Sequence, residues 1–329
     1  MGALIDGVWH IDPPVIRAGD GKFVRKDTQH RNWITSDGRA GPSGRAGFKA
    51  EAGRYHLYIS HACPWAHRTA IFRKLKGLEN MVSLSVVHWH MADMGWSFEP
   101  GEGVIADPFL GARYIHQVYQ AADSSYSGRA SVPVLWDKQQ KTIVSNESSE
   151  IIRMFNSAFD KVGAVAGDYY PEDLRAEINR INSRIYDTLN NGVYLCGFAK
   201  SQSAYEQAVY PLFETLDWLD QLLGSSRYLL GNQITEADWR LFTTLVRFDP
   251  VYVGHFKCNL HRIIDYSNIS NYLRDLYQVR NVAETVHFDH IKSHYYVSHK
   301  TVNPTGVVPV GPVMDLQAPH NRNRFTAGI

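Results

Sequence analysis

The stretch Ser60-His61-Ala62-Cys63-Pro64-Trp65-Ala66-His67-Arg68-Thr69 separates two segments of different periodicity. Before it, residues 54–59 (Arg-Tyr-His-Leu-Tyr-Ile) alternate as a β-strand does. After it, residues 69–76 have helical spacing and are followed by Gly77, a residue suited to the end of a helix. The pattern therefore predicts that Cys63 lies where a strand gives way to a helix.

Cys63 has the setting of a reactive thiol. Pro64 suits the first helical position, where a missing N–H does no harm, and the positive end of a helix favours a thiolate. An unperturbed thiol with a pKa of about 8.5 is only ~3% ionised at pH 7, and each unit of depression raises that fraction almost tenfold. The alternative is a buried cysteine that acts as a small hydrophobe. The proline, the helix start and the basic residues His67 and Arg68 favour the reactive site.

The composition is typical of a soluble globular protein with about two domains. The chain has 329 residues, of which 44% are hydrophobic and 20% charged. The net charge of +1 gives no indication of binding to nucleic acid or to an acidic membrane surface. No stretch approaches the 18 apolar residues of a membrane helix, and the first residues lack a secretory signal.

The three cysteines are Cys63, Cys196 and Cys258. Their odd number and spacing predict neither a disulfide framework nor a metal site, and they favour a cytoplasmic location. Ala66 stands where a dithiol oxidoreductase carries its second cysteine, so redox chemistry at Cys63 is expected to use one thiol of the protein. The thiol that completes it comes from outside, or from one of the other two cysteines if the fold brings one close.

The order of the expected elements indicates a thioredoxin-like domain. The segments read strand, helix, strand and then helix, strand, strand, helix, over residues 54–60, 64–76, 81–87, 113–122, 131–137, 142–144 and 150–159. Pro133 opens the third strand, and in the thioredoxin-like fold that proline is usually cis and faces the active-site cysteine. The alternative is an edge-strand proline without a role.

The expected fold class is therefore α/β plus all-α, with coil extensions at both ends. Helical patterns start at Pro171 and run through Leu189, then cover 204–223, and another follows the capping box Thr235–Asp238, before patterns at 269–279 and 281–291. The expected domains are an irregular arm, a thioredoxin-like domain, a helical domain and a C-terminal coil extension, at residues 1–50, 51–160, 165–296 and 297–329.

These domains together resemble a cytosolic glutathione transferase. Within that superfamily the chain resembles the omega-like Xi class, the glutathionyl-hydroquinone reductases. The motifs that carry this resemblance are Cys63-Pro-Trp-Ala-His-Arg-Thr69, Tyr126-Ser-Gly-Arg129, Val132-Pro-Val-Leu-Trp136, Ser145-Asn-Glu-Ser148, Arg247-Phe-Asp-Pro-Val-Tyr-Val253, Phe288-Asp-His-Ile291 and Lys300-Thr-Val-Asn-Pro-Thr-Gly306.

The resemblance implies a reaction at sulfur. Cys63 attacks the sulfur of a glutathionyl-hydroquinone, which releases the hydroquinone and leaves a mixed disulfide between Cys63 and glutathione. A second glutathione then frees Cys63 as glutathione disulfide forms. By the same resemblance Tyr194 is the proton donor and acceptor, while Tyr252 and Tyr295 lower the pKa of the thiol and contact the substrate ring.

Five further residues are expected to bind glutathione, which serves as co-substrate with no bound cofactor. The backbone of Val132 pairs with the cysteinyl part of the peptide. Glu147 takes the γ-glutamyl amine and Ser148 its carboxylate, although both also suit an ordinary helix cap. Arg129 neutralises a carboxylate, and Trp96 packs on the peptide or on the ring.

Other functions compete with this one. A glutaredoxin-like thiol transferase or dehydroascorbate reductase would use the same cysteine. Conjugation of glutathione to electrophiles is disfavoured because a cysteine occupies the position of the usual Ser or Tyr. A non-catalytic scaffold is disfavoured by the intact Cys63-Pro64 and Val132-Pro133 pairs.

By resemblance the expected assembly is a homodimer, and its partners are small molecules rather than nucleic acid or membrane.

Overall fold

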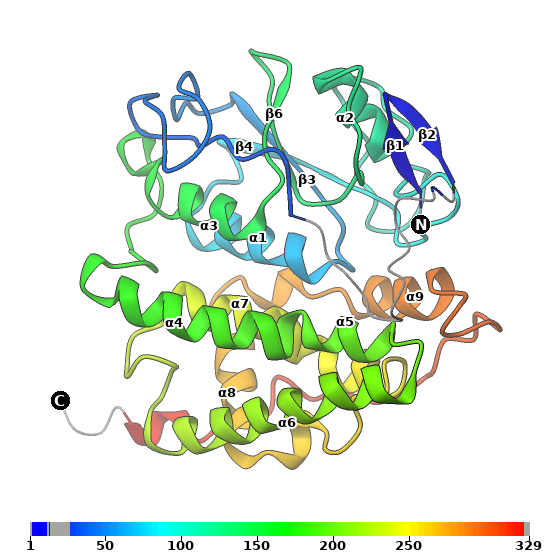
Figure 1. The fold of residues 1–329 in the computed structure, drawn as a ribbon. Coiled ribbons are helices and arrows are strands. Elements are labelled where there is room, and N and C mark those ends of the chain that lie inside the picture. The colour runs from blue at the N-terminus through cyan, green and yellow to red at the C-terminus, as the bar shows by residue number, and fades with distance from the viewer. Residues whose placement is uncertain (1, 12, 14–26, 326–329) are drawn as a thin grey trace. The chain divides into compact units, whose positions relative to one another are not determined.

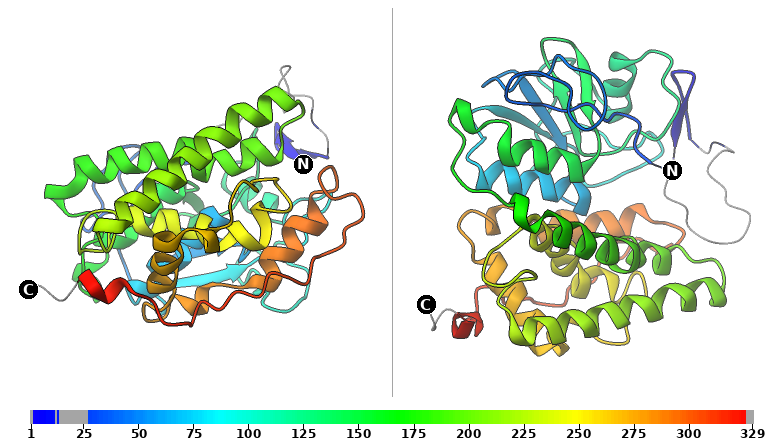
Figure 2. Two further views of the ribbon diagram at one scale, coloured as in Figure 1. Left: turned by 90° about the horizontal axis from the view of Figure 1, so that it is seen from below. Right: turned by 60° about the vertical axis from the view of Figure 1, so that its left-hand side comes forward.

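The computed structural model describes residues 2–11, 13 and 27–325. The described residues group into two compact units (Figures 1 and 2). The first contains residues 2–11, 13, 27–167 and 285–294, and the second contains residues 168–284 and 295–325. Residues 1, 12 and 14–26 of the expected arm and residues 326–329 of the expected C-terminal extension lie outside the described residues. This grouping does not show that any part of the chain folds by itself, so the four domain ranges given above stay a prediction.

A four-stranded sheet forms the centre of the first unit. Its order is β4 (Val82–Val86), β3 (Tyr55–Ile59), β5 (Val134–Asp137) and β6 (Thr142–Ser145). β4 runs parallel to β3, β5 runs antiparallel to β3, and β6 runs antiparallel to β5. All five residues of β3 are buried, as expected of an internal strand. This confirms the thioredoxin-like order of elements.

Helices cover both faces of that sheet. α1 (Pro64–Leu75) and α3 (Ser148–Ser157) pack together on one face, and α2 (Ile115–Ala122) lies on the other (Figure 1). Gly77 ends α1 as predicted, with a φ of 61° in the left-handed region. Its N–H donates to Lys74 O at 3.1 Å, and the N–H of Leu78 donates to Arg73 O at 2.8 Å. These are the two hydrogen bonds of a Schellman cap.

The N-terminal arm is not wholly irregular, contrary to expectation. It begins with an antiparallel hairpin of β1 (Ala3–Ile5) and β2 (Val8–His10). Asp6 and Gly7 form the two-residue turn with φ values of 47° and 76°. An Asp-Gly pair between apolar residues is a strong hairpin signal, so the sequence contained this information. Leu4 and Gly128 exchange two backbone hydrogen bonds of 2.9 Å, which tie the hairpin to the loop after α2.

The second unit is helical. It contains α4 (Arg175–Ile185), α5 (Gly192–Gly197), α6 (Gln202–Ser225), α7 (Glu236–Arg247) and α8 (Ser267–Tyr277), with π-helical turns at Tyr186–Asn190 and Phe248–Tyr252. The predicted capping box at the start of α7 is present: Thr235 N donates to Asp238 Oδ2 at 2.8 Å. α9 (Phe288–Ser298) is divided between the units: its residues up to His294 belong to the first unit, and those from Tyr295 belong to the second.

One predicted helix is in the wrong place. We expected a helix over 281–291, but Asn281 has a left-handed φ of 68°, which interrupts a right-handed helix. A short 3₁₀ turn follows at Ala283–Thr285, and α9 begins only at Phe288. The helix predicted to run through Leu189 also differs, because a π-helical turn replaces the α-helix from Tyr186.

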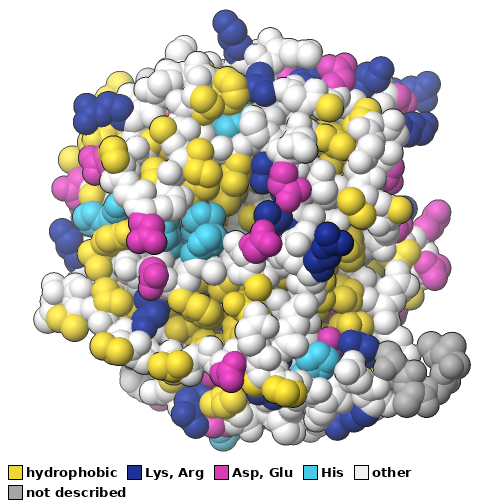
Figure 3. Space-filling view, turned by 180° about the vertical axis from the view of Figure 1, so that it is seen from behind, with side chains coloured by type: hydrophobic (Ala, Val, Ile, Leu, Met, Phe, Trp, Pro, Cys, Tyr) yellow, Lys and Arg dark blue, Asp and Glu magenta, His cyan; other side chains and the backbone are white. Residues whose placement is uncertain are grey.

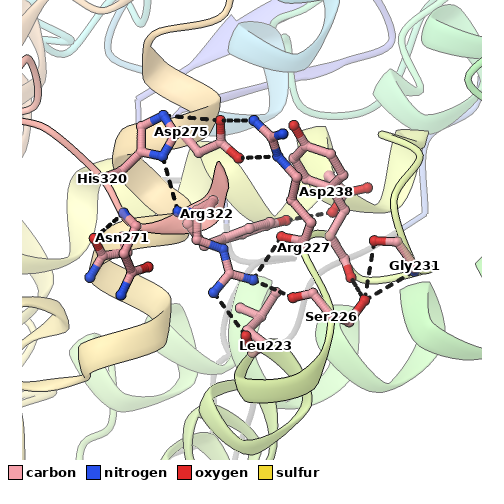
Figure 4. Close-up of polar contacts among 12 residues, drawn as sticks. Leu223, Ser226, Arg227, Gly231, Asp238, Asn271, Asp275, His320 and Arg322 are labelled. Carbon is pink, nitrogen blue, oxygen red and sulfur yellow. Dashed lines mark hydrogen bonds and ion pairs between the residues drawn. The ribbon is translucent and has the colours of Figure 1, made fainter. Parts of the chain in front are cut away.

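The C-terminal extension is anchored to the second unit by Arg322 (Figure 4). This side chain is fully buried, and its guanidinium donates to Leu223 O at 2.8 Å, to Arg227 O at 2.9 Å and to Ser226 O. Burial, together with the charge of Arg324, lowers the pKa of Arg322 to about 10. The guanidinium thus satisfies Leu223 O in the last turn of α6, which has no partner within the helix, and two carbonyl groups directly after the helix.

The surface matches the small net charge. Positive and negative side chains are interspersed over the face shown in Figure 3. Within the described ranges 2–11, 13 and 27–325, no helix has the length and apolar character to cross a membrane. The same ranges hold no group of three or more His, Cys, Asp or Glu side chains that could bind a metal ion.

Candidate active site

Cys63 caps the N-terminus of α1. Its backbone is extended, with φ −75° and ψ 120°, and Pro64 occupies the first turn as predicted. The Cys63 carbonyl accepts the first helical hydrogen bond, from His67 N at 2.9 Å. The side chain is half-buried, so the sulfur lies at the positive end of the helix, which favours a thiolate.

The start of β5 lies beside this sulfur. Cys63 Sγ is 3.5 Å from Val132 O, to which the thiol donates. The Val132–Pro133 peptide bond is cis. The prediction made for this proline, a cis bond opposite Cys63, is therefore confirmed. None of the three cysteines, all in the described part of the chain, forms a disulfide.

A polar cluster of Arg68, Glu147 and Ser148 joins α1 to the start of α3. Arg68 is almost fully buried, donates from Nη1 to Ser148 Oγ at 3.4 Å, and lies with its guanidinium 4.6 Å from the centre of the Trp65 ring. Ser148 is the first residue of α3. The helix N-terminus and the guanidinium together suit a carboxylate ligand.

Glu147 is the N-cap of α3. Its carboxylate accepts hydrogen bonds from Ser149 N at 3.0 Å, from Ser149 Oγ at 2.8 Å and from Thr28 Oγ1 at 3.2 Å. Burial raises its pKa, but these hydrogen bonds and the charge of Arg68 outweigh burial, and the pKa is lowered overall. Glu147 is thus held as a carboxylate, which suits an ammonium group.

Trp96 and Arg129 lie elsewhere in the first unit. Trp96 is 7% exposed, and its ring stacks on His294 with centroids 4.6 Å apart. Arg129 is half-buried, and its carbonyl accepts a hydrogen bond from Tyr126 Oη at 3.4 Å. Their expected contacts with glutathione stay a prediction.

The three predicted tyrosines form one cluster in the second unit. Tyr194 Oη lies 2.6 Å from Tyr295 Oη, and Tyr252 Oη lies 3.1 Å from Tyr295 Oη. These side chains come from α5, from the π-helical turn that follows α7, and from α9. The ring of Phe256 packs about equally against all three, with centroid distances of 5.5 Å.

Burial controls the acidity of these phenols. Tyr252 and Tyr295 are at most 1% exposed, and burial raises the pKa of each well above its ordinary value. The charge of Arg247 acts in the opposite direction on both. The cluster can hold and pass protons through hydrogen bonds, but it holds them tightly.

Comparison with known proteins finds matches along most of the chain. Residues 62–158 match the N-terminal domain of glutathione S-transferases and residues 202–275 match their C-terminal domain. The curated glutathionyl-hydroquinone reductase YqjG of Escherichia coli K12 is 58% identical over 324 residues, which covers 98% of this chain and 99% of that relative. The chain belongs to the glutathione S-transferase family.

Two further relatives and a solved structure of YqjG indicate the class of this transferase. The glutathionyl-hydroquinone reductase PcpF of Sphingobium chlorophenolicum is 55% identical and covers 96% of this chain and 98% of its own. The Xi-class transferase of Natrialba magadii is 47% identical with a TM-score of 0.93, at 98% coverage of both chains. A glutathione-bound structure of Escherichia coli YqjG is 57% identical with a TM-score of 0.91, covering 98% and 99%. They confirm the predicted resemblance to the Xi class.

Two residues near the predicted site of the transferase escaped the sequence analysis. Thr28 bonds Glu147, although 119 residues separate them. His294 stacks on Trp96 and directly precedes Tyr295. Neither belongs to a spacing pattern, so only the fold reveals them.

Proposed function

We propose that this protein reduces glutathionyl-hydroquinones to hydroquinones at the expense of glutathione. The main support is the single thiol of Cys63 at a helix N-cap, 3.5 Å from Val132 O, with Ala66 in place of a second cysteine. The names of two curated relatives that align over nearly the whole chain agree with this reaction.

In the first step the Cys63 thiolate attacks the sulfur that joins glutathione to the ring. The carbon–sulfur bond breaks and its electron pair goes to the hydroquinone, while a new disulfide joins Cys63 to glutathione. In the second step a glutathione thiolate attacks this disulfide, and glutathione disulfide leaves. The role of helix α1 is to favour the thiolate at Cys63, which acts as nucleophile and then as leaving group.

Breaking an aryl–sulfur bond needs help, because an aryl carbanion is a poor leaving group. If the ring carbon takes up a proton and a ring hydroxyl loses one, the sulfur becomes attached next to a carbonyl. The leaving group is then an enolate, the monoanion of the hydroquinone, which takes up a proton from solvent to give the hydroquinone. We assign the proton transfer at carbon to Tyr194, supported by its hydrogen bond to Tyr295 Oη, with Tyr252 and Tyr295 beside the ring.

The expected glutathione contacts complete the proposal. Val132 binds the peptide backbone, Glu147 the γ-glutamyl amine and Ser148 the γ-glutamyl carboxylate, and the lowered pKa of Glu147 supports its part. Arg129 neutralises a carboxylate, and Trp96 packs against the bound molecule.

An assay with glutathionyl-menadiol as substrate tests the reaction directly. With glutathionyl-menadiol and glutathione, we expect the wild-type protein to release menadiol and Cys63→Ala to release none. Cys196→Ala is the matched control, because it also removes a thiol, and it should stay active. Equal rates for wild type and Cys63→Ala would refute the proposed nucleophile.

The external thiol has its own test. After a single turnover without added glutathione, intact-mass and peptide analysis should find one glutathione on Cys63. A disulfide between Cys63 and Cys196 or Cys258 would contradict the requirement for a second glutathione.

Glutaredoxin-like thiol transfer is the second candidate, because it uses the same cysteine without the ring chemistry. Tyr194→Phe separates the two. We expect a loss of roughly 100-fold or more on glutathionyl-menadiol, as for removal of a general acid, with nearly normal reduction of a small disulfide such as bis(2-hydroxyethyl) disulfide. Equal losses on both substrates would argue against proton transfer by Tyr194.

We also propose that the protein acts as a homodimer in the cytoplasm. The cytoplasmic location rests on the odd number of cysteines, and the dimer on family resemblance. Light scattering coupled to gel filtration should give twice the mass of 37.3 kDa, and a monomer at micromolar concentration would contradict the dimer.

A further inference from the structure

Three buried phenols share a short chain of hydrogen bonds. Tyr295 Oη lies between Tyr194 Oη at 2.6 Å and Tyr252 Oη at 3.1 Å. A phenol has one proton to donate and can also accept. If Tyr194 gives its proton away, Tyr295 can donate to the resulting phenolate and Tyr252 can donate to Tyr295. The negative charge is then shared along the chain.

That charge is costly in this environment. Tyr252 and Tyr295 are almost fully buried, and aromatic rings of Phe256 and His299 surround Tyr295 at centroid distances of 5.5 Å and 5.3 Å. Burial of a charge without a counter-charge is strongly unfavourable. A proton donor in such a place therefore needs a nearby positive group.

Arg247 is a buried cation in the same segment of the chain as Tyr252. It is the last residue of α7 and directly precedes the π-helical turn that ends at Tyr252. Its side chain is fully buried, and Nη1 donates to Thr243 O at 2.8 Å within its own helix. This hydrogen bond fixes the guanidinium, whose charge lowers the pKa of both Tyr252 and Tyr295 against the effect of burial.

Of the other titratable groups near the phenols, His255 and Cys258 carry no charge at pH 7. His255 and His299 pack edge-on against Tyr295, with centroids 6.2 Å and 5.3 Å away, and they are hydrogen-bonded to each other at 3.2 Å. Burial, aided by the charge of Lys257, lowers the pKa of His255 to about 4, so its ring is neutral at pH 7. Cys258 donates its N–H to Tyr252 O, and burial raises the pKa of its thiol, which is therefore also neutral.

We propose that Arg247 is a positioning residue of the ring chemistry, a buried cation that stabilises the phenolate formed when Tyr194 protonates the substrate ring. The inference rests on the proposed function and adds a residue to it. In this step the O–H bond of Tyr194 breaks and a C–H bond forms at the ring carbon that bears sulfur. The hydroxyl proton of the hydroquinone returns to the phenol chain, so the cluster ends with the number of protons with which it began.

Two substrates test the role of Arg247. For Arg247→Met we expect kcat/KM on glutathionyl-menadiol to fall by roughly 10- to 100-fold, within the range of general-acid effects. Reduction of bis(2-hydroxyethyl) disulfide, which needs no proton at a ring carbon, should change far less. The solvent isotope effect on kcat for the thioether should increase, because proton transfer becomes slower than the other steps.

Arg240→Met is the matched control. Arg240 lies on the same helix and is nearly as buried, but it pairs with Glu236 at 3.6 Å. It should leave the ratio of the two activities unchanged. Arg247→Lys keeps the positive charge, so its ratio of thioether to disulfide activity should be close to that of the wild-type protein.

The outcomes separate this inference from the proposed function. If the wild-type protein does not cleave glutathionyl-menadiol, the proposed function fails. If it does, but Arg247→Met lowers both activities equally or leaves the isotope effect unchanged, the role of Arg247 is refuted. If circular dichroism shows that Arg247→Met does not fold, the test is made on Arg247→Lys instead. A ratio of thioether to disulfide activity in Arg247→Lys as low as that in Tyr194→Phe would contradict the inference.

Discussion

His56 lies in the internal strand β3, with both ring nitrogens hydrogen-bonded. Nδ1 is 2.7 Å from Ser83 Oγ and Nε2 is 2.9 Å from Ser85 Oγ, both on the neighbouring strand β4. The ring is fully buried, and burial lowers its pKa from 6.5 to about 4. The native protein therefore keeps this histidine neutral at a pH where the unfolded chain is already protonated.

This difference predicts a loss of stability in weak acid. Below pH 6.5 the unfolded state binds a proton at His56 that the native state takes up only near pH 4, so the free energy of unfolding falls across that interval. A shift of this size corresponds to at most roughly 3 kcal/mol. His255, also with a pKa of about 4, adds to the slope. Urea unfolding between pH 7 and pH 4.5 measures it.

His56→Gln should flatten this pH dependence, because its side chain does not titrate. His90→Gln, at a half-exposed position outside the sheet, is the matched control and should keep the wild-type slope. An unchanged slope in His56→Gln would show that another group causes the acid sensitivity.

Glu147 allows a test of the proposed glutathione site at one residue. Glu147→Gln keeps the shape and a cap acceptor but removes the charge that would hold the γ-glutamyl amine. We expect KM for glutathione to rise roughly tenfold, as for loss of one charged hydrogen bond, with little change in kcat. Glu150→Gln, three residues on and paired with Arg31, is the control. A larger change in Glu150→Gln than in Glu147→Gln would contradict the assignment.

At the scale of elements, local signals decided what could be predicted. The strand before Cys63 and the stop at Gly77 were correct because each depends on neighbours in sequence. The capping box at α7 was also predicted, but its wider role was not. Asp238 also accepts from Leu229 N at 3.0 Å and from Tyr272 Oη at 2.8 Å, and these partners come from other segments.

The cap of α1 predicts a clear effect of adding one methyl group. At Gly77 a Cβ would lie 2.8 Å from Val165 Cγ2, and φ is 61°. Gly53 also has a positive φ, of 78°, but nothing lies within 4 Å of its Cβ position. Gly53→Ala should cost about 1 kcal/mol from backbone strain alone, and Gly77→Ala about 1–3 kcal/mol more. Guanidinium unfolding measures both. Equal costs would mean that Val165 moves aside freely.

At the scale of the whole molecule, the predicted site residues divide between the two units. Cys63 and the five glutathione-binding candidates lie in the first, and the three tyrosines in the second. Contacts such as Cys63 with Val132, 69 residues apart, or Tyr194 with Tyr295, 101 residues apart, have no signature in local spacing. Physical reasoning from the sequence predicted a reactive thiol at Cys63, whereas the roles of the three tyrosines were predicted only through family resemblance.

The C-terminal anchor predicts that residues far from the candidate site control stability. Arg322→Met should lower the free energy of unfolding by about 2–4 kcal/mol, because buried carbonyl groups of α6 and the segment after it lose their donor. Arg324→Met removes an exposed arginine two residues later and should cost less than about 1 kcal/mol. Thermal and urea unfolding of both variants measure the difference. Equal effects would show that the tail is held by other contacts.

The anchor also has a consequence for synthesis on the ribosome. Leu223 O, near the end of α6, receives its hydrogen bond from a residue 99 positions later in the chain. At 5–20 residues per second, translation needs about 5–20 s to cover that distance. Leu223 O thus depends on water until Arg322 emerges from the ribosome. The helical unit therefore completes its native contacts only after Arg322 has been synthesised, however early its first helices form.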